Sequence, residues 1–236
     1  MNAGQRRERY VSHAQARRIY DLIGRHQDSR LLSERGALER LVELCAFEDA
    51  HAVFEFGCGT GRFAARLLRT HLPDDCRYVA VDVSPRMVEL ARAALAEWPE
   101  RARVDLTDGS PQLRPADGEF DRFICTYVLD LLSPDDTETL LAEAHRILRP
   151  SGLLCLASLT FGTTSSARLL TSLWRRAWEV RPWLVGGCRP VALTGMLPAR
   201  SWAVRHRTTA YAHSLSSEVL VAERLELPPM PRPGRA

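Results

Sequence analysis

The feature that most limits the fold of this chain is a turn with three glycines on alternate positions. Gly57, Gly59 and Gly61 follow an apolar run that ends at Phe56 and precede an amphipathic stretch. Such a turn lets a ligand come close to the backbone, and the free N–H groups at the start of the following helix point at it. The turn therefore predicts a strand, a ligand-binding loop and a helix in that order, as in a parallel α/β sheet.

Short apolar runs alternate with amphipathic stretches over residues 51–160, which is typical of a sheet built from strand–helix–strand units. The expected strands are His51–Phe56, Tyr78–Val81, Ala102–Leu106, Phe120–Thr126 and Gly152–Leu159. Helices are expected over Gly61–His71, Pro85–Trp98 and Pro134–Leu148. The last two follow a serine, so that each has an N-cap residue and a proline at its first position. The segment 149–152 predicts a turn into the fifth strand.

The segments on either side complete the expected architecture. Helices over Ala14–His26 and Leu31–Cys45 form N-terminal caps (residues 1–48) outside the sheet, and a helix is expected over Ser165–Val180. Strands over Ser201–Ala212 and Ser216–Leu225 close the sheet. We predict an α/β fold with a Rossmann-like, doubly wound, seven-stranded and mostly parallel sheet with an antiparallel closing strand. Its domain is residues 49–226, with a lid around 161–200, and the Pro-rich residues 227–236 are a flexible tail.

Composition narrows the function classes. The chain has 236 residues, 45% of them apolar and 26% charged, which is typical of a globular domain the size of an enzyme. Its 32 strong bases give a net charge of only +3 and are interspersed with acids, so nucleic acid is not expected as a partner. No apolar run reaches the ~18 residues that span a bilayer and no secretory signal is present, so we expect a cytoplasmic protein. The six cysteines lack metal-ligand spacing and predict reduced core thiols and no metal site.

Two acidic residues follow strands at positions where a nucleotide can be held. Asp82 ends the second strand, 21 residues after Gly61, where it is placed to accept hydrogen bonds from ribose hydroxyls or to lie in solvent as a strand-end acid. Asp108-Gly109 follows the third strand, where an acid can accept from an exocyclic amine such as that of adenine, although Asp-Gly is also a common turn. The GxGxG spacing differs from the GxGxxG dinucleotide fingerprint, which weakens a pyrophosphate-binding interpretation without eliminating it.

Five segments then form a recognisable ordered set: residues 55–61, Asp82, Asp108, residues 120–132 and residues 143–152. In order and spacing they resemble the motifs of class I S-adenosylmethionine-dependent methyltransferases, and within these the small-molecule subgroup related to quinone-biosynthesis methyltransferases. The resemblance covers about residues 50–160. One departure is Pro150-Ser151-Gly152, where the family has Pro-Gly-Gly.

The resemblance implies S-adenosylmethionine as cofactor and assigns roles around the glycine turn. Gly57, Gly59 and Gly61 would form the loop under the methionine part, and Glu55 would hold its ammonium directly or through water. The backbone of Thr126 and Tyr127 would meet the same methionine end.

The remaining implied contacts concern the nucleoside part of the cofactor. Asp82, followed by Val83, would clasp the ribose hydroxyls. Met87 would lie against the adenine ring, with Asp108 and Gly109 at its edge. Met87 fits a plain core position equally well.

The expected reaction is methyl transfer to a small-molecule acceptor, which the protein must hold in line with the methyl group. Asp130, beyond the fourth strand in an apolar setting, is the best-placed candidate for a catalytic base; the alternative is a helix N-terminal or ion-pair acid. Tryptophan and arginine gather in the lid and suggest an anionic or lipid-like acceptor or contact with a membrane surface. The alternative is that Trp174 and Trp178 cover the sheet while the arginines face water. The lid cluster comprises Trp174, Arg175, Arg176, Trp178, Arg181, Trp183 and Arg189.

Gly186–Pro190 is the expected acceptor loop, and Tyr20 with the Gln27-Asp28 pair is a candidate cofactor lid. Two other functions remain open at this point: a nicotinamide-dependent oxidoreductase, and a non-catalytic module that keeps the fold and works through the lid surface. The acceptor atom and the oligomeric state are left open.

Overall fold

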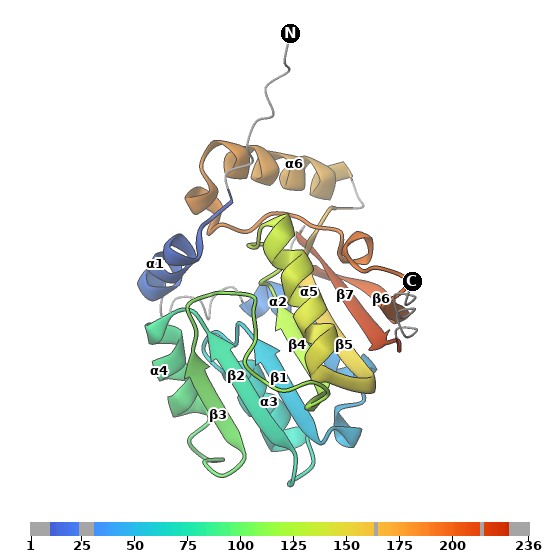
Figure 1. Cartoon of the computed structure of the whole chain (residues 1–236). Coiled ribbons are helices and arrows are strands. Elements are labelled where there is room, and N and C mark those ends of the chain that lie inside the picture. Colours follow the sequence, from blue (N-terminus) through green and yellow to red (C-terminus); the bar gives the residue numbers. More distant parts are fainter. Residues whose placement is uncertain (1–9, 24–30, 163–164, 213–214, 227–236) are drawn as a thin grey trace, which may run out of the picture.

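The computed structural model describes residues 10–23, 31–162, 165–212 and 215–226. The predicted tail at 227–236 and the Gln27-Asp28 pair lie outside the described residues. Seven strands form one sheet in the order β3-β2-β1-β4-β5-β7-β6 (Figure 1). They are β1 (Ala52–Phe56), β2 (Arg77–Asp82), β3 (Ala102–Leu106), β4 (Phe120–Thr126), β5 (Leu148–Thr160), β6 (Trp202–Ala212) and β7 (Leu215–Arg224).

Strands β1 to β5 pair in parallel, and β7 is antiparallel to both of its neighbours, β5 and β6. The strand order reverses between β1 and β4, because β1 pairs with β2 on one side and with β4 on the other. In open α/β sheets ligands bind at such a switch point, outside the carboxyl ends of the strands. The predicted fold class, with its mostly parallel sheet and antiparallel closing strand, is confirmed.

Helices cover both faces of the sheet (Figure 1). One core joins the sheet to α2 (Leu31–Leu44), α3 (Arg62–Thr70) and α4 (Pro85–Ala94). The other face carries α5 (Pro134–Ile147) together with the short 3-10 helix η4 (Leu193–Met196). Two helices lie at the carboxyl end of the strands: α1 (His13–Ile23) and α6 (Ser165–Val180).

The local signals for two helix starts are confirmed. Ser84 is the N-cap of α4, where its hydroxyl accepts from the N–H of Met87 and Pro85 is the first helical residue. Ser133 is the N-cap of α5, where its hydroxyl accepts from the N–H of Asp136 and Pro134 is the first helical residue. Helices α4 and α5 therefore begin where the two Ser-Pro pairs predict.

Two predicted boundaries are wrong. Helix α4 ends at Ala94 instead of Trp98, since residues 95–98 form turns ahead of Pro99, which disfavours a helical residue before it. The expected turn at 149–152 lies within β5, which begins at Leu148 paired with Phe120 and passes through an irregularity before Leu153. Ser151 takes the left-handed conformation there, with φ of 60°.

The six cysteines are all buried and free, as expected of core thiols. No helix in the described part of the chain is long and apolar enough to cross a membrane.

Candidate functional site

A cavity opens at the carboxyl ends of the strands, at the switch point between β1 and β4. Its lining comes from the strand ends and the glycine turn, and from α1, α2, α6, β7 and the loop at 186–190. Predicted site residues on its lining are Glu55, Gly57, Gly59, Asp82, Val83, Gly109, Thr126, Tyr127 and Asp130. Most of the predicted site therefore converges on one cavity.

The glycine turn takes a shape that other residues would adopt only with strain. Gly57, Gly59 and Gly61 have φ of 80°, 53° and 74°, in the left-handed region. A Cβ on Gly57 would lie 2.3 Å from Cγ2 of Val128, on the loop after β4. The turn therefore lies against the β4 end of the cavity, and its backbone stays open to a ligand.

Gly61 packs behind this loop and does not line the cavity. It is the N-cap of α3, and a Cβ there would lie 2.8 Å from the backbone Cα of Ala91 on α4. The third glycine thus permits close approach between the glycine turn and helix α4.

Asp82 ends β2 and is buried against the glycine turn. Its Oδ2 accepts from the N–H of Gly59 at 2.8 Å, and its Oδ1 accepts from the N–H of Ser84 at 2.9 Å. Burial raises the pKa of this carboxyl, while these backbone hydrogen bonds act in the opposite direction. Since a carboxylate has about four lone-pair sites, it retains capacity for ribose hydroxyls beside the two N–H groups.

Glu55 lies near the end of β1 and is also buried. Its Oε2 accepts from the Tyr78 hydroxyl at 2.8 Å. Burial raises the pKa of Glu55 to about 7; the Tyr78 hydrogen bond lowers it, and the negative charge of Asp82 raises it. A cation in the cavity, such as an ammonium group, would stabilise the ionised form.

The β4 end contributes Tyr127 and Asp130. Tyr127 has φ of 55°, a conformation that non-glycine residues seldom adopt, and its hydroxyl donates to Ser217 on β7 at 2.9 Å. Asp130 is 1% exposed. Both loop residues line the same cavity as the glycine turn.

On the lid side of the cavity, hydrogen bonds from two tryptophans and one arginine join α6, the loop at 186–190 and the loop after β4. Trp174 and Trp178 of α6 donate to the carbonyls of Cys188 and Gly187, each at 2.9 Å. Arg189 donates to the carbonyls of Asp130 and Leu132 at 3.1 and 2.8 Å. The expected acceptor loop at 186–190 is therefore fixed to both α6 and the loop after β4.

These contacts distinguish, for some residues, between the two interpretations of the tryptophans and arginines of the lid. The tryptophans do face inward, and Arg175 and Arg176 are exposed, as in the alternative interpretation. Arg189 differs, because its guanidinium lies over the rings of both Tyr10 and Trp178, 4.8 and 5.5 Å from their centroids.

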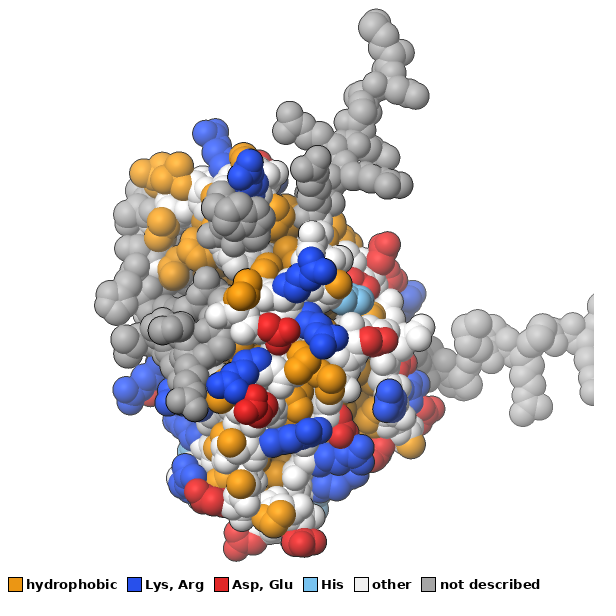
Figure 2. Space-filling view, turned by 90° about the vertical axis from the view of Figure 1, so that its left-hand side faces the viewer, with side chains coloured by type: hydrophobic (Ala, Val, Ile, Leu, Met, Phe, Trp, Pro, Cys, Tyr) orange, Lys and Arg blue, Asp and Glu red, His pale blue; other side chains and the backbone are white. Residues whose placement is uncertain are grey.

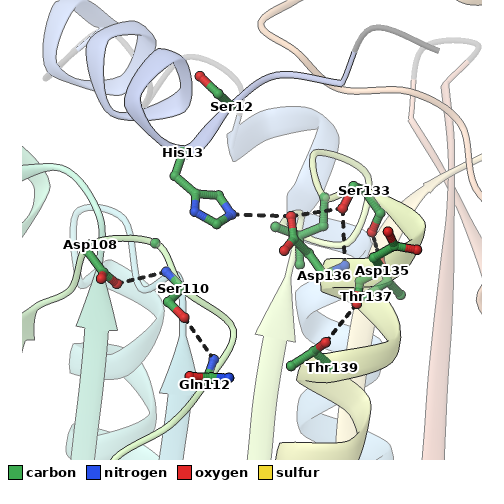
Figure 3. A network of polar contacts seen from close by, with 12 residues as sticks. Ser12, His13, Asp108, Ser110, Gln112, Ser133, Asp135, Asp136, Thr137 and Thr139 are labelled. Carbon is green, nitrogen blue, oxygen red and sulfur yellow. Dashed lines mark hydrogen bonds and ion pairs between the residues drawn. The ribbon is translucent and has the colours of Figure 1, made fainter. Parts of the chain in front are cut away.

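Helix α1 crosses the cavity mouth and is held at both ends. At its start, Nε2 of His13 lies 3.2 Å from Oδ2 of Asp136, the residue that Ser133 caps at the start of α5 (Figure 3). Near its end, Asp21 accepts from the Ser84 hydroxyl at 2.5 Å, at the start of α4. Gly109 allows the close approach of α1, since a Cβ there would lie 2.8 Å from Cβ of His13.

Two further predicted residues do not reach the cavity. Met87 is fully buried and is not on the lining, which fits the core position that the sequence also allows. Asp108 is directed to its own turn, where Oδ1 accepts from the N–H of Ser110 (Figure 3). Their roles toward adenine stay predictions.

Sequence reasoning missed His13, Glu34, Phe63 and Ser217, which also line the cavity. They come from α1, α2, α3 and β7, and none of them belongs to a spaced motif. Only the fold brings them to the site. Among the described lining residues, four carry carboxylates and one, Arg62, carries a guanidinium; the acids are Glu34, Glu55, Asp82 and Asp130.

Comparison with protein families identifies residues 53–152 as matching the model of a methyltransferase domain. Among curated relatives, carboxy-S-adenosyl-L-methionine synthase of Shewanella sediminis is 28% identical over 123 residues, 51% of this chain and 50% of that protein. The same enzyme of Chromohalobacter salexigens is 30% identical over 44% of this chain and 38% of its own length. The chain therefore spans about half the length, or less, of these relatives.

Solved structures show the same fold at low sequence identity. The [4+2]-cyclase SpnF has a TM-score of 0.68 at 16% identity, covering 90% of this chain and 97% of its own. The N-methyltransferase NodS of Bradyrhizobium japonicum has a TM-score of 0.62 at 19% identity, covering 82% and 97%. A geranyl diphosphate methyltransferase, solved with sinefungin, has a TM-score of 0.61 at 11% identity, covering 81% and 78%. The finer resemblance to quinone-biosynthesis methyltransferases is not confirmed by these comparisons.

Proposed function

Since residues 53–152 match the model of a methyltransferase domain, we propose that this chain transfers a methyl group from S-adenosylmethionine to a small-molecule acceptor. The observation that carries the proposal is that Asp82 and the glycine turn line one cavity and are hydrogen-bonded to each other. The alternatives of a nicotinamide-dependent oxidoreductase and a non-catalytic module are not favoured by these findings.

The cavity residues fit this cofactor by charge and shape. S-adenosylmethionine supplies a methyl group on a positively charged sulfur, and it also carries an ammonium group and ribose hydroxyls. Asp82 would accept from the hydroxyls, Glu55 would hold the ammonium, and the left-handed glycines leave the backbone open beneath the methionine part. Thr126 and Tyr127 would border the same end.

The protein's part in catalysis is then orientation and exclusion of water. Helix α1, held at His13 and Asp21, would close the cofactor side. Helix α6 and the loop at 186–190, held through Arg189, would close the acceptor side as a lid.

We also propose that the outer face of α6 contacts a lipid surface, which would suit a lipid-like acceptor. Leu169, Leu173 and Val180 are 64%, 55% and 68% exposed and share one helix face with Arg176. This face lies opposite Trp174 and Trp178, which are turned toward the protein. The helix carries three arginines against one acid, so an anionic surface complements it: Arg168, Arg175 and Arg176 against Glu179. Figure 2 shows hydrophobic and basic side chains together at the end of the molecule where Figure 1 places α6.

Calorimetric titration with S-adenosylmethionine and S-adenosylhomocysteine tests the proposed cofactor. We expect saturable binding of both, lost or weakened at least tenfold in Asp82→Ala, because that substitution removes the predicted ribose contact and the acceptor for Gly59. Asp105→Ala is the matched control, since Asp105 lies on β3 and pairs with Arg103 away from the cavity. Absence of binding to the wild type would contradict the proposal.

Product analysis then identifies the reaction. Mass spectrometry of a turnover mixture with a metabolite extract should show S-adenosylhomocysteine formed together with a methylated acceptor. Because the matched curated relatives are named carboxy-S-adenosyl-L-methionine synthase, formation of that compound in place of a methylated acceptor would favour their activity and contradict methyl transfer.

A further inference from the structure

Asp130 differs from every other buried carboxylate among the described residues. Both of its oxygens are without a hydrogen-bond partner, although the side chain is 1% exposed. The other buried carboxylates are all satisfied. Glu55 and Asp82 have the partners given above, Asp121 accepts from the N–H groups of His51 and Ala52, and Glu218 accepts from the N–H of Leu193. Since a buried polar group without a partner is costly, Asp130 calls for a donor that the described chain does not provide.

The nearest basic side chain does not supply that donor. Arg189 directs its guanidinium to the backbone carbonyls of Asp130 and Leu132, so it fixes the loop and not the carboxylate. Burial raises the pKa of Asp130 to about 7, and the charge of Glu34 on α2 contributes to the rise. The nearby backbone N–H groups of Asp130 and Leu159 and the charge of Arg189 act in the opposite direction. The thiol of Cys125 and the hydroxyl of Tyr127 are the other titratable groups that sense its charge.

The walls beside Asp130 define what kind of molecule fits there. Leu131 follows it in the loop, Leu159 comes from β5, Trp174 from α6 and Leu215 from β7. Among the described lining residues, Glu34 is the acid whose charge acts on Asp130, and it would repel an anion. The glycine turn, Glu55 and Asp82, which would hold the cofactor, line the same cavity.

We propose that Asp130 accepts a hydrogen bond from the nucleophilic hydroxyl or amine of an apolar acceptor, and that it is the base that takes the proton from this group. This rests on the proposed function. In the step, the bond between the acceptor oxygen or nitrogen and its hydrogen breaks, and a bond from that hydrogen to a carboxylate oxygen of Asp130 forms. The electron pair stays on the acceptor atom and forms its new bond to the methyl carbon, while the carbon–sulfur pair stays on the departing sulfur. Of the two acceptor classes suggested by the sequence, this arrangement favours the lipid-like one over the anionic one.

The first measurement tests whether the buried carboxylate of Asp130 lowers the stability of the folded protein. Its folded pKa of about 7 lies above the unfolded value, so the folded state loses stability as pH rises from about 4 through 7. Asp130→Asn should therefore raise the melting temperature at pH 8 and change it little at pH 4.5. Asp121→Asn is the matched control and should lower it, because Asp121 is a satisfied buried acid outside the cavity. A lower melting temperature of Asp130→Asn at pH 8 would overturn the proposal.

The second measurement tests which functional group on an apolar molecule the cavity binds most tightly. The full chain saturated with S-adenosylhomocysteine is titrated calorimetrically with three molecules of one skeleton: 4-butylphenol, 4-butylaniline and 4-butylbenzoate. We expect the phenol or the aniline to bind the wild type at least tenfold more tightly than the benzoate, and Asp130→Asn to remove this preference. Equal or tighter binding of the benzoate, an unchanged preference in the variant, or binding of none of the three would each overturn the proposal.

The affinity for S-adenosylhomocysteine separates this proposal from the one on which it rests. In Asp130→Asn it should stay within about threefold of the wild type, since none of the cofactor contacts proposed above involves Asp130. If the wild type binds no S-adenosylhomocysteine, the proposed function fails. If it binds but the probes do not discriminate, only the role of Asp130 fails.

Discussion

The N–H of Gly59 donates to Oδ2 of Asp82 at 2.8 Å, which joins the glycine turn after β1 to the end of β2. The other oxygen of Asp82 accepts from Ser84, the N-cap of α4. One buried carboxylate thus sets the relative position of the turn and of the helix that follows β2. The residue expected to bind ribose is also the residue that shapes the floor of the cavity.

Asp82→Asn should loosen this connection. The asparagine has only one side-chain oxygen to accept hydrogen bonds, so either Gly59 or Ser84 loses its partner. A hydrogen bond to a charged group contributes about 1.5–3 kcal/mol, so we expect roughly 10- to 100-fold faster exchange of one of these two amide hydrogens by NMR. In Asp105→Asn, the exchange of both amides should stay unchanged. Unchanged exchange in Asp82→Asn would show that the turn holds its shape without the carboxylate.

The sequence predicts this part of the molecule well because its signals are local. Three glycines after an apolar run, an acid at the next strand end, and Ser-Pro pairs each act within a few residues, and the structure confirms the elements they predict. The two wrong boundaries have different causes, one local and one not. Trp98 is affected by the following Pro99, and the start of β5 depends on the pairing of Leu148 with Phe120.

The other half of the cavity is formed by residues that lie far apart in the sequence, so local sequence patterns could not predict it. Glu34 and Ser217 are 183 positions apart in the sequence, and they reach one cavity only because α2 packs against β6 and β7. The same reasoning explains Arg189, whose contact with the carbonyl of Asp130 joins residues 59 positions apart. A pattern in one segment carries no information about such partners.

Gly61→Ala should destabilise the fold through helix packing. The residue has φ of 74°, and the new Cβ would lie 2.8 Å from the backbone of Ala91, which cannot rotate away. Left-handed strain costs about 1–2 kcal/mol and overpacking about 1–3 kcal/mol, so we expect the free energy of unfolding in urea to fall by about 2–5 kcal/mol. Gly195→Ala is the control, because a Cβ there meets no atom within 4 Å. A change of less than about 0.5 kcal/mol in Gly61→Ala would contradict the role of this close contact.

Binding of S-adenosylhomocysteine should become tighter as pH rises through 7. The pKa of Glu55 is raised to about 7 from an ordinary 4.5, so the free protein holds a proton there that a bound ammonium would displace. The affinity should rise by up to about tenfold between pH 6 and pH 8, with proton release detected by titration in buffers of different ionisation enthalpy. Glu55→Gln keeps an oxygen for the Tyr78 hydroxyl and should remove most of this pH dependence. The same pH dependence in both proteins would assign it to another group.

Helix α1 should slow the dissociation of the cofactor. It is held across the cavity mouth by His13 at one end and by Asp21 at the other. Since a half-exposed pair contributes about 0.2–1 kcal/mol, His13→Ala should speed release of S-adenosylhomocysteine by up to about fivefold in stopped-flow displacement. His51→Ala is the control, because this histidine precedes β1 at the opposite end of the sheet. Equal rates in all three proteins would mean that the contact with Asp136 does not hold α1 closed.

The outer face of α6 should bind anionic vesicles. Leu169 and Leu173 are more than half exposed on a helix that carries more arginine than acid, and insertion of each leucine would contribute about 1.5–3 kcal/mol. The wild type should therefore sediment with vesicles that contain phosphatidylglycerol and much less with pure phosphatidylcholine, because the arginines add attraction to an anionic surface. Leu169→Ser with Leu173→Ser should weaken sedimentation at least tenfold, whereas Leu106→Ser, at an exposed leucine on the edge strand β3, should not. If the wild type fails to sediment with either vesicle, the lipid contact is excluded and a lipid-like acceptor would have to reach the cavity from solution.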